Sequence, residues 1–211
     1  MLSTKKRIHA EADVWQFRHT APVPTVAIRR WVSHCAALCL PEKIYWCDGS
    51  AGERDLLRER AQLNEGFRVG MAAFMSQACI EVEPVDEEVG EAKKLEDLSA
   101  IFRGCMRGRT MYVVPFVTRP VNGSLGVRGL QVTDSPAVAA DMEEANISGE
   151  PAWVALSRKE PALFCVHTEG RHAVKAVRVW SFPEERAVWA LGPGFDTVAV
   201  VGALQFGGRW S

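Results

Sequence analysis

Apolar and polar positions follow two periods along this chain, one typical of helices and one typical of buried strands. Residues 25–40 place apolar side chains at helical spacing, at Ile28, Trp31, Val32, Cys35 and Cys39. This period predicts an amphipathic helix that is stopped by Pro41. Residues 108–118, GRTMYVVPFVT, are apolar in both alternation classes, with Met111, Val113 and Val117 on one face and Tyr112, Val114 and Phe116 on the other. Such a run predicts a central strand that is buried on both faces.

The remaining pattern predicts short strands and capped helices. Strands are expected at 43–48, from Arg128 onward, at 162–168 and twice within 177–191. Ser50 and Glu53 form the S-x-x-E signature of a helix start, and Asp134 or Ser135 can cap a helix that has Pro136 in its first turn. A short helix is expected within 98–106, and the acidic segment 81–98 is expected to be a surface loop.

This order of elements predicts the fold class. Roughly three helices and six or more strands do not alternate strictly, so we expect an α/β fold, a mixed sheet with packed helices. A length of 211 residues favours one large domain over two small ones. We assign residues 1–20 to a polar N-terminal arm and residues 21–211 to the domain.

Charge and composition exclude several classes of function. The net charge is −1, which favours neither nucleic acid nor a membrane surface as a partner. No apolar run is long enough to span a bilayer, and the N-terminus has no apolar signal region. We therefore expect a cytoplasmic protein with reduced thiols. The six cysteines lack zinc-finger spacing, and Cys35 and Cys39 are interpreted as core thiols.

Sequence motifs assign no reaction to the chain. There is no Gly-Lys dipeptide, which a phosphate-binding loop requires, and no G-x-S-x-G or H-x-x-x-H motif. The stretch 192–202, GPGFDTVAVVG, is interpreted as a turn between strands, and His167 as a hydrogen-bonded core histidine. We therefore predict no catalytic residue and no metal ligand from residue chemistry.

Five stretches in one order nevertheless resemble a known family. They are PEKIYWCDGSAGE (41–53), GCMRGRTMYVVPF (104–116), LQVTDSPAVAADM (130–142), LFCVHTEG (163–170) and WSFPEERAVWALGPGF (180–195). Together they resemble the N-terminal domain of GTP-dependent phosphoenolpyruvate carboxykinase. The resemblance implies that the fold is the mixed α/β fold of that domain.

The resemblance also implies a chemistry. The family interconverts oxaloacetate and phosphoenolpyruvate plus carbon dioxide, a lyase reaction of gluconeogenesis that uses GTP and Mn²⁺ or Mg²⁺. Arginines hold the substrate carboxylates, and metals stabilise the developing charge. By resemblance, Arg109 is an architectural or rim cation, and Gly194 and Phe195 are weak substrate-binding positions.

Several positions depart from the family pattern. Cys79 stands where the family has a substrate-binding arginine, and a neutral thiol cannot clamp a carboxylate. Phe195 replaces a tyrosine, and Thr197 and Val198 replace a glycine and an asparagine. The sequence GAL at 202–204 replaces the family's GKK, which carries a metal-binding lysine.

The resemblance covers about the N-terminal third of the family and not its nucleotide half. We therefore expect no cofactor to bind this chain alone and no independent activity. Two alternatives stay open. One is a half-enzyme that a second protein chain completes. The other is a binding module that uses the old cleft for a small dicarboxylate, or its C-terminal apolar edge (197–211) for a protein partner.

Overall fold

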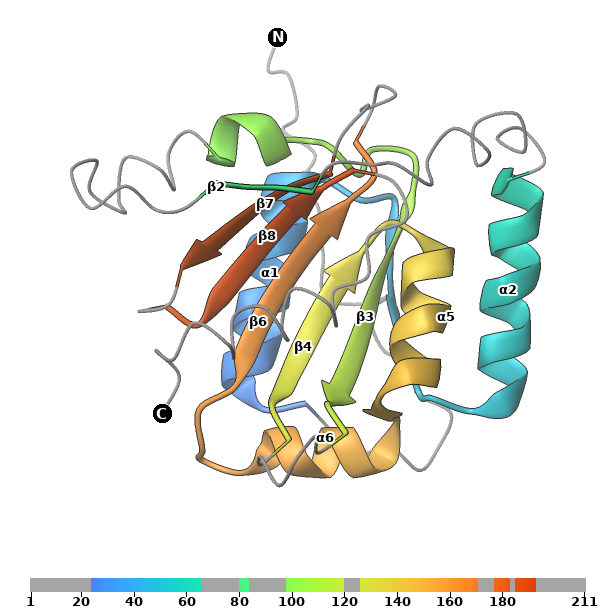
Figure 1. Ribbon diagram of the computed structural model, residues 1–211, viewed down its shortest axis with the longest axis vertical. Coiled ribbons are helices and arrows are strands. Elements are labelled where there is room, and N and C mark those ends of the chain that lie inside the picture. Colours follow the sequence, from blue (N-terminus) through green and yellow to red (C-terminus); the bar gives the residue numbers. More distant parts are fainter. Residues whose placement is uncertain are drawn as a thin grey trace, which may run out of the picture.

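The computed structural model describes residues 24–65, 80–83, 98–119, 126–170, 177–182 and 185–192 of the chain. Its named helices and strands, in chain order, are α1 Val26–Cys39, β1 Lys43–Trp46, α2 Ala51–Glu65, β2 Ile80–Glu83, β3 Thr110–Val117, β4 Arg128–Thr133, α5 Pro136–Ala145, β5 Ile147–Ser148, α6 Glu150–Ser157, β6 Leu163–Thr168, β7 Val177–Phe182 and β8 Ala187–Leu191 (Figure 1). Residues 98–102 form a further short helix. The predicted N-terminal arm, 1–20, lies outside the described residues.

The strands form one mixed sheet, as predicted. Their order is β1-β3-β4-β6-β8-β7-β2, and β5 pairs with β3 off this path. The pairs β1–β3, β4–β6, β6–β8 and β2–β7 are parallel, whereas β3–β4, β3–β5 and β7–β8 are antiparallel. The strand predicted at 109–117 is therefore an interior strand between β1 and β4.

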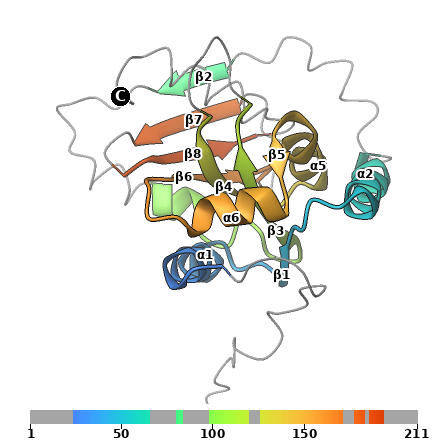
Figure 2. The same cartoon turned by 90° about the horizontal axis from the view of Figure 1, so that it is seen from below.

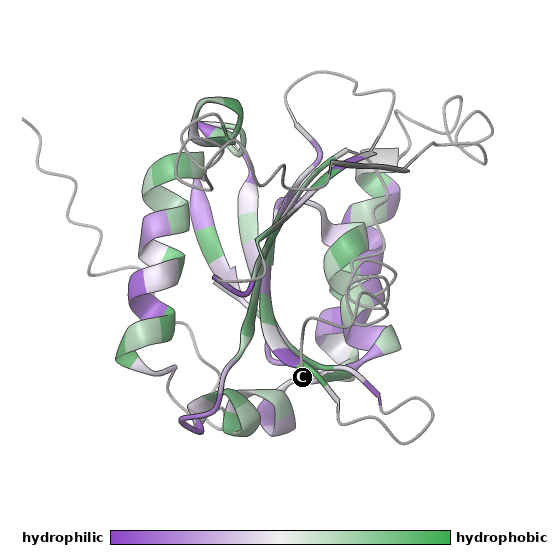
Figure 3. Ribbon diagram, turned by 60° about the vertical axis from the view of Figure 1, so that its left-hand side comes forward, coloured by the Kyte–Doolittle hydropathy of each residue, from purple (hydrophilic) through white to green (hydrophobic). Residues whose placement is uncertain are grey.

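Two hydrophobic cores cover the two faces of the sheet, and β3 contributes to both. Met111 and Val113 pack with α1 and with the helix at 98–102. Tyr112, Val114 and Phe116 pack on the opposite face with α5. Figure 3 shows the sheet between these two layers of helices. The alternation in the sequence thus assigned the two faces of β3 correctly.

Local sequence signals explain where most helices begin. Thr25 accepts a hydrogen bond from the backbone N–H of Ile28 at the start of α1 (3.3 Å). Ser135, rather than Asp134, caps α5, with its Oγ 3.4 Å from the backbone N of Val138. Cys35 and Cys39 are fully buried in the core beneath α1, which confirms their interpretation as core thiols.

Three elements differ from the sequence prediction. The segment expected to be a loop at 81–98 begins with β2, and its residues 84–97 lie outside the described part of the chain. The short strand β5 and the helix α6 were not predicted. Helix α6 starts at Gly149 without any side-chain cap, so the usual signal for a helix start is missing. Figures 1 and 2 show α6 crossing one end of strands β3 and β4.

Gly149, which precedes α6, lets the start of this helix pack against the backbone of Asp48 and Gly49. Gly49 and Gly149 both have positive φ, at 71° and 69°. A Cβ atom on Gly49 would lie 2.6 Å from the backbone of Gly149, so neither position accepts a side chain without displacement.

Within the described residues, no helix has the length and apolar character needed to cross a membrane.

Candidate functional site

Polar side chains gather at one end of the sheet, which we call the polar end. The start of β3 lies beside the end of β4 because these strands are antiparallel, and Tyr112 pairs with Thr133. The end of β6 lies there too because β6 is parallel to β4, and Thr133 pairs with His167. The residues that follow parallel strands at their carboxyl ends are the usual place for ligand sites in open α/β sheets.

An ion pair joins the loops of the polar end. The Arg109 guanidinium donates from Nη1 to Asp134 Oδ2 (2.7 Å) and from Nη2 to the backbone oxygen of Gly170 (2.7 Å). Asp134 is fully buried, and its carboxylate also accepts from Thr168 Oγ1 (2.9 Å) and from the backbone N–H of Glu169 (2.9 Å). Arg109 therefore connects the entry of β3 to the ends of β4 and β6.

His167 belongs to a second buried network behind this pair. Its Nε2 lies 2.8 Å from the backbone oxygen of Gly192, which can only accept, so Nε2 carries the proton. Its Nδ1 therefore accepts from the Thr133 hydroxyl, 2.7 Å away. Burial lowers the pKa of His167, an effect that outweighs the opposing field of Asp134. This confirms the interpretation of His167 as a hydrogen-bonded core histidine.

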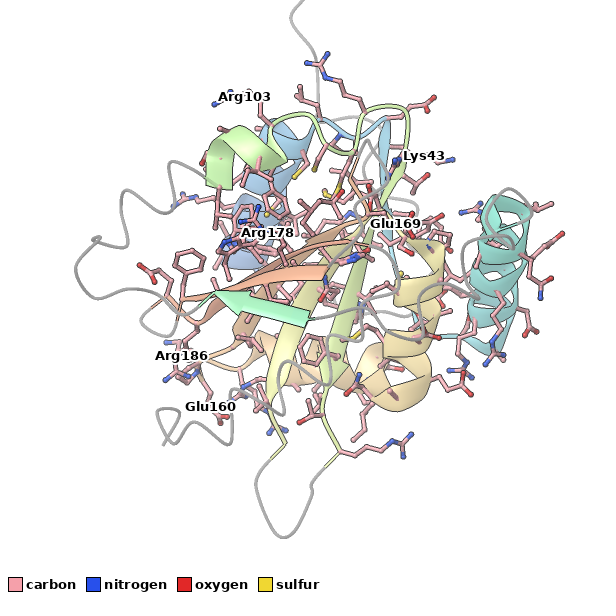
Figure 4. All side chains as sticks on the ribbon, turned by 45° about the horizontal axis from the view of Figure 1, so that its top comes forward. Lys43, Arg103, Glu160, Glu169, Arg178 and Arg186 are labelled. Atoms are coloured by element: carbon pink, nitrogen blue, oxygen red, sulfur yellow. The ribbon has the colours of Figure 1, made fainter. Side chains whose placement is uncertain are left out.

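A cavity of about 480 Å³ opens at the polar end. Its lining is mostly polar and comprises Lys43, Arg60, Leu63, Gly108, Arg109, Thr110, Tyr112, Asp134, Pro136 and Glu169. Figure 4 shows Lys43 and Glu169 at this end of the sheet, near the start of β3. Three cations and two carboxylates thus line one space, and one pair of opposite charges, Arg109 and Asp134, is already matched.

Two cations of the lining have no carboxylate partner within the described residues, Lys43 at the start of β1 and Arg60 on α2. The Arg60 Nη1 lies 3.4 Å from the hydroxyl of Tyr112, and its guanidinium lies 5.9 Å from the ring centre of Tyr45. These aromatic contacts hold the Arg60 side chain beside the cavity. The arrangement suits a small anion, because a carboxylate is the natural partner of an arginine and a lysine.

The predicted site residues have different outcomes. Arg109 is an architectural cation that also lines the cavity rim, as the sequence indicated. Gly194, Phe195 and Cys79 lie outside the described residues, so their assignment stays a prediction. Lys43 and Arg60 were missed, since no motif marks them and only the pairing of β1 with β3 and the position of α2 bring them together.

Few carboxylates of the polar end, among the described residues, are available to a metal ion. Asp134 already accepts three hydrogen bonds, one of them from its ion-pair partner Arg109, and the other carboxylate of the lining, Glu169, has contacts of its own. In the part of the chain that the structure describes, one group of side chains has ligand atoms close enough for a metal ion, namely Cys47, Glu53 and Glu143. Glu143 lies near the far end of α5, about 12 Å along the helix from Ser135.

Comparison with known proteins connects this chain to one family. Residues 68–209 match the family described as phosphoenolpyruvate carboxykinase N-terminal domain. Curated relatives with the name phosphoenolpyruvate carboxykinase [GTP] include those of Treponema pallidum strain Nichols (27% identical), Anaeromyxobacter sp. strain K (28%) and Ascaris suum (28%). The alignments cover 84%, 86% and 85% of this chain but 34%, 34% and 35% of the relatives. The chain therefore spans about a third of the length of the relatives that it matches.

Proposed function

The chain belongs to the phosphoenolpyruvate carboxykinase N-terminal domain family, and from this premise we propose that residues 1–211 bind a small dicarboxylate weakly at the polar end of the sheet. The proposal includes no turnover by these residues alone. It rests on one structural observation, the cavity lined by Lys43, Arg60 and Arg109. Oxaloacetate, the dicarboxylate of the family's reaction, is the ligand that we expect.

The charges of the cavity support weak rather than tight binding. Arg109 is committed to Asp134, so it offers a ligand less than an unpaired guanidinium would. Lys43 is exposed, and contacts with exposed cations are worth about 0.2–1 kcal/mol each. Cys79 supplies no cation at the position where the family resemblance places one. We therefore expect a dissociation constant of about 1 mM, which corresponds to about 4 kcal/mol.

We expect no turnover by these residues alone because they lack the features of a nucleotide-binding site. The 211 residues contain no Gly-Lys phosphate loop, and the polar end offers too few unengaged carboxylates for a metal. The curated relatives carry GTP in their names, and this chain aligns with a third of them. Turnover would then need a polypeptide that supplies the nucleotide site, in the same chain or in a second one.

Isothermal titration calorimetry tests both parts of the proposal. The protein is titrated with oxaloacetate, and separately with GTP in the presence of Mn²⁺ in cell and syringe. We expect weak, saturable heat with oxaloacetate and none with GTP. Saturable micromolar binding of GTP would contradict the nucleotide part, and no heat with oxaloacetate at several millimolar would contradict the substrate part.

A further inference from the structure

Three potential ligand side chains meet in the interior, away from the polar end. Cys47 follows β1, Glu53 lies in the first turn of α2, and Glu143 lies in the last turns of α5. Their exposed fractions are 0%, 5% and 3%. One ligand atom from each residue, the thiol sulfur and two carboxylate oxygens, lies within 4.8 Å of the others.

Most carboxylate oxygens of this cluster have no hydrogen-bond donor. Glu53 Oε1 and both side-chain oxygens of Glu143 are buried and without a partner among the described residues. A buried carboxylate without a donor or a cation is costly, by several kcal/mol for an ion. Glu143 is therefore a buried side chain whose polar neighbours, among the described residues, are the thiol and the second carboxylate of the same cluster.

The other atoms of the cluster are held in place by the backbone. Glu53 Oε2 accepts from the backbone N–H groups of Asp48 (2.8 Å) and Gly49 (2.6 Å), and the Tyr45 hydroxyl is a further neighbour of this carboxylate. Trp153 Nε1 donates to the backbone oxygen of Cys47 (3.0 Å) and fixes the peptide that carries the thiol. Such outer contacts orient the ligands of metal sites.

The charges around the cluster do not neutralise it. Arg54 is the cation that acts on Glu143, and its Nη1 donates to the backbone oxygen of Gly49 (3.1 Å). Ligand oxygens of Glu53 and Glu143 lie within 4.8 Å of one another in this buried cluster. A cation between two buried carboxylates this close would offset the cost of burying them.

We propose that Cys47, Glu53 and Glu143 form a buried zinc site. Zinc accepts mixed sulfur and oxygen ligands, and a thiolate favours it over Mg²⁺ or Ca²⁺. Each of the three residues supplies one donor atom, and a water molecule would take the fourth tetrahedral position. Bond lengths of about 2.3 Å to sulfur and about 2.0–2.2 Å to oxygen place tetrahedral ligands about 3.3–3.6 Å apart, so the side chains draw in by about 1 Å on binding.

This proposal does not depend on dicarboxylate binding, because the cluster and the cavity share no residue. The competing arrangement is a proton shared between Glu53 and Glu143, which would need no metal. Since all three ligands are buried, the ion must enter as the chain folds, and the experiment therefore starts from unfolded protein.

For the test, the full chain is unfolded in guanidinium and refolded in three separate samples, which contain a chelator, Zn²⁺ or Co²⁺. We expect one zinc per chain by elemental analysis, and thiolate-to-cobalt charge-transfer absorption in the Co²⁺ sample. We also expect a higher melting temperature with Zn²⁺ than with chelator. A wild-type protein that retains no zinc and melts at one temperature in both conditions would overturn the proposal in favour of the shared proton.

Variants identify the ligands. Cys47→Ser should abolish the charge-transfer band, and Glu143→Gln should weaken zinc affinity more than about tenfold. Glu144→Gln, a change in the exposed neighbour that pairs with Arg58, and Cys165→Ala, at a buried thiol outside the cluster, should bind zinc like the wild type. An unchanged cobalt spectrum in Cys47→Ser would also overturn the proposal. If a ligand variant fails to fold, the wild-type comparison decides.

Discussion

Arg109 Nη1 lies 2.7 Å from Asp134 Oδ2, so the residue that enters β3 is ion-paired with the residue that leaves β4. The Asp134 side chain is fully buried, whereas 29% of the Arg109 side chain is exposed. The pair therefore fixes the geometry of the polar end and at the same time reduces the charge that the cavity can offer to an anion.

Replacing Arg109 with methionine should destabilise the protein by roughly 3 kcal/mol. The change leaves the Asp134 carboxylate buried with two of its donors, and breaking one partner of a buried pair typically costs about 3–5 kcal/mol. Partial exposure of Arg109 places the effect at the lower end of that range. Urea unfolding followed by circular dichroism measures the difference.

Arg103→Met is the matched control, because Arg103 is an exposed arginine of the same loop region. It should change stability by less than about 0.5 kcal/mol. Equal losses in the two variants would show that the Arg109–Asp134 pair has no special role.

Ser50→Ala should cost roughly 0.5–2 kcal/mol, as expected for loss of an N-cap. The Ser50 hydroxyl accepts from the backbone N–H of Glu53 at 3.2 Å, at the start of α2. Ser33→Ala, on the exposed face of α1, is the control and should not lower the melting temperature. A melting temperature of Ser50→Ala equal to that of the wild type would argue against this cap.

At the start of α2 the sequence predicted the helix boundary but not the hydrogen bonds of the preceding turn. The S-x-x-E pattern located the start of α2, but the Glu53 carboxylate bonds to the N–H groups of Asp48 and Gly49 and not to that of Ser50. The backbone N–H of Ser50 donates instead to Asp48 Oδ1. Local patterns therefore predicted the helix boundary, whereas the detailed hydrogen bonding depended on the turn.

Long-range proximity explains the rest of the difference. The strand β3 and its two faces could be predicted because their signal lies within eight consecutive residues. The Cys47–Glu53–Glu143 cluster could not, because Glu143 is 90 positions from Glu53 and reads as a solvated helical carboxylate. The packing of α5 against α2, where Arg58 pairs with Glu144 at 2.6 Å, is what brings Glu143 close to Glu53. The cavity cations Lys43 and Arg60 are likewise joined only by the fold.

The part of the stability that depends on His167 should fall as the pH drops below about 6.5, the ordinary pKa of histidine. Burial lowers the pKa of His167 in the folded protein, so the unfolded chain binds a proton that the native chain does not. The stability is therefore intact above the unfolded pKa and is lost between that value and the lower folded pKa, at up to about 1.4 kcal/mol per pH unit. The difference in urea midpoint between the wild type and His167→Gln, followed from pH 5 to 8, isolates this contribution, since the raised pKa of Glu143 contributes a slope of opposite sign in both proteins.

His167→Gln should lose less stability than the wild type as the pH falls from 8 to 5, because glutamine can keep a donor for Gly192 and an acceptor for Thr133 without titrating. His34→Gln, at an exposed position of α1, should leave the slope as it is in the wild type. A slope in His167→Gln equal to that of the wild type would assign the effect to other groups.

The central claim, dicarboxylate binding at the polar end, is tested most directly by saturation-transfer NMR of oxaloacetate with matched lysine and arginine variants. We expect Lys43→Met and Arg60→Met each to weaken binding roughly two- to fivefold, the effect of losing one partly screened charge. Lys159→Met, at an exposed lysine outside the cavity lining, should bind like the wild type. Binding that is equal in all four proteins, or that falls as much in Lys159→Met, would contradict the assignment of the cavity as the ligand site.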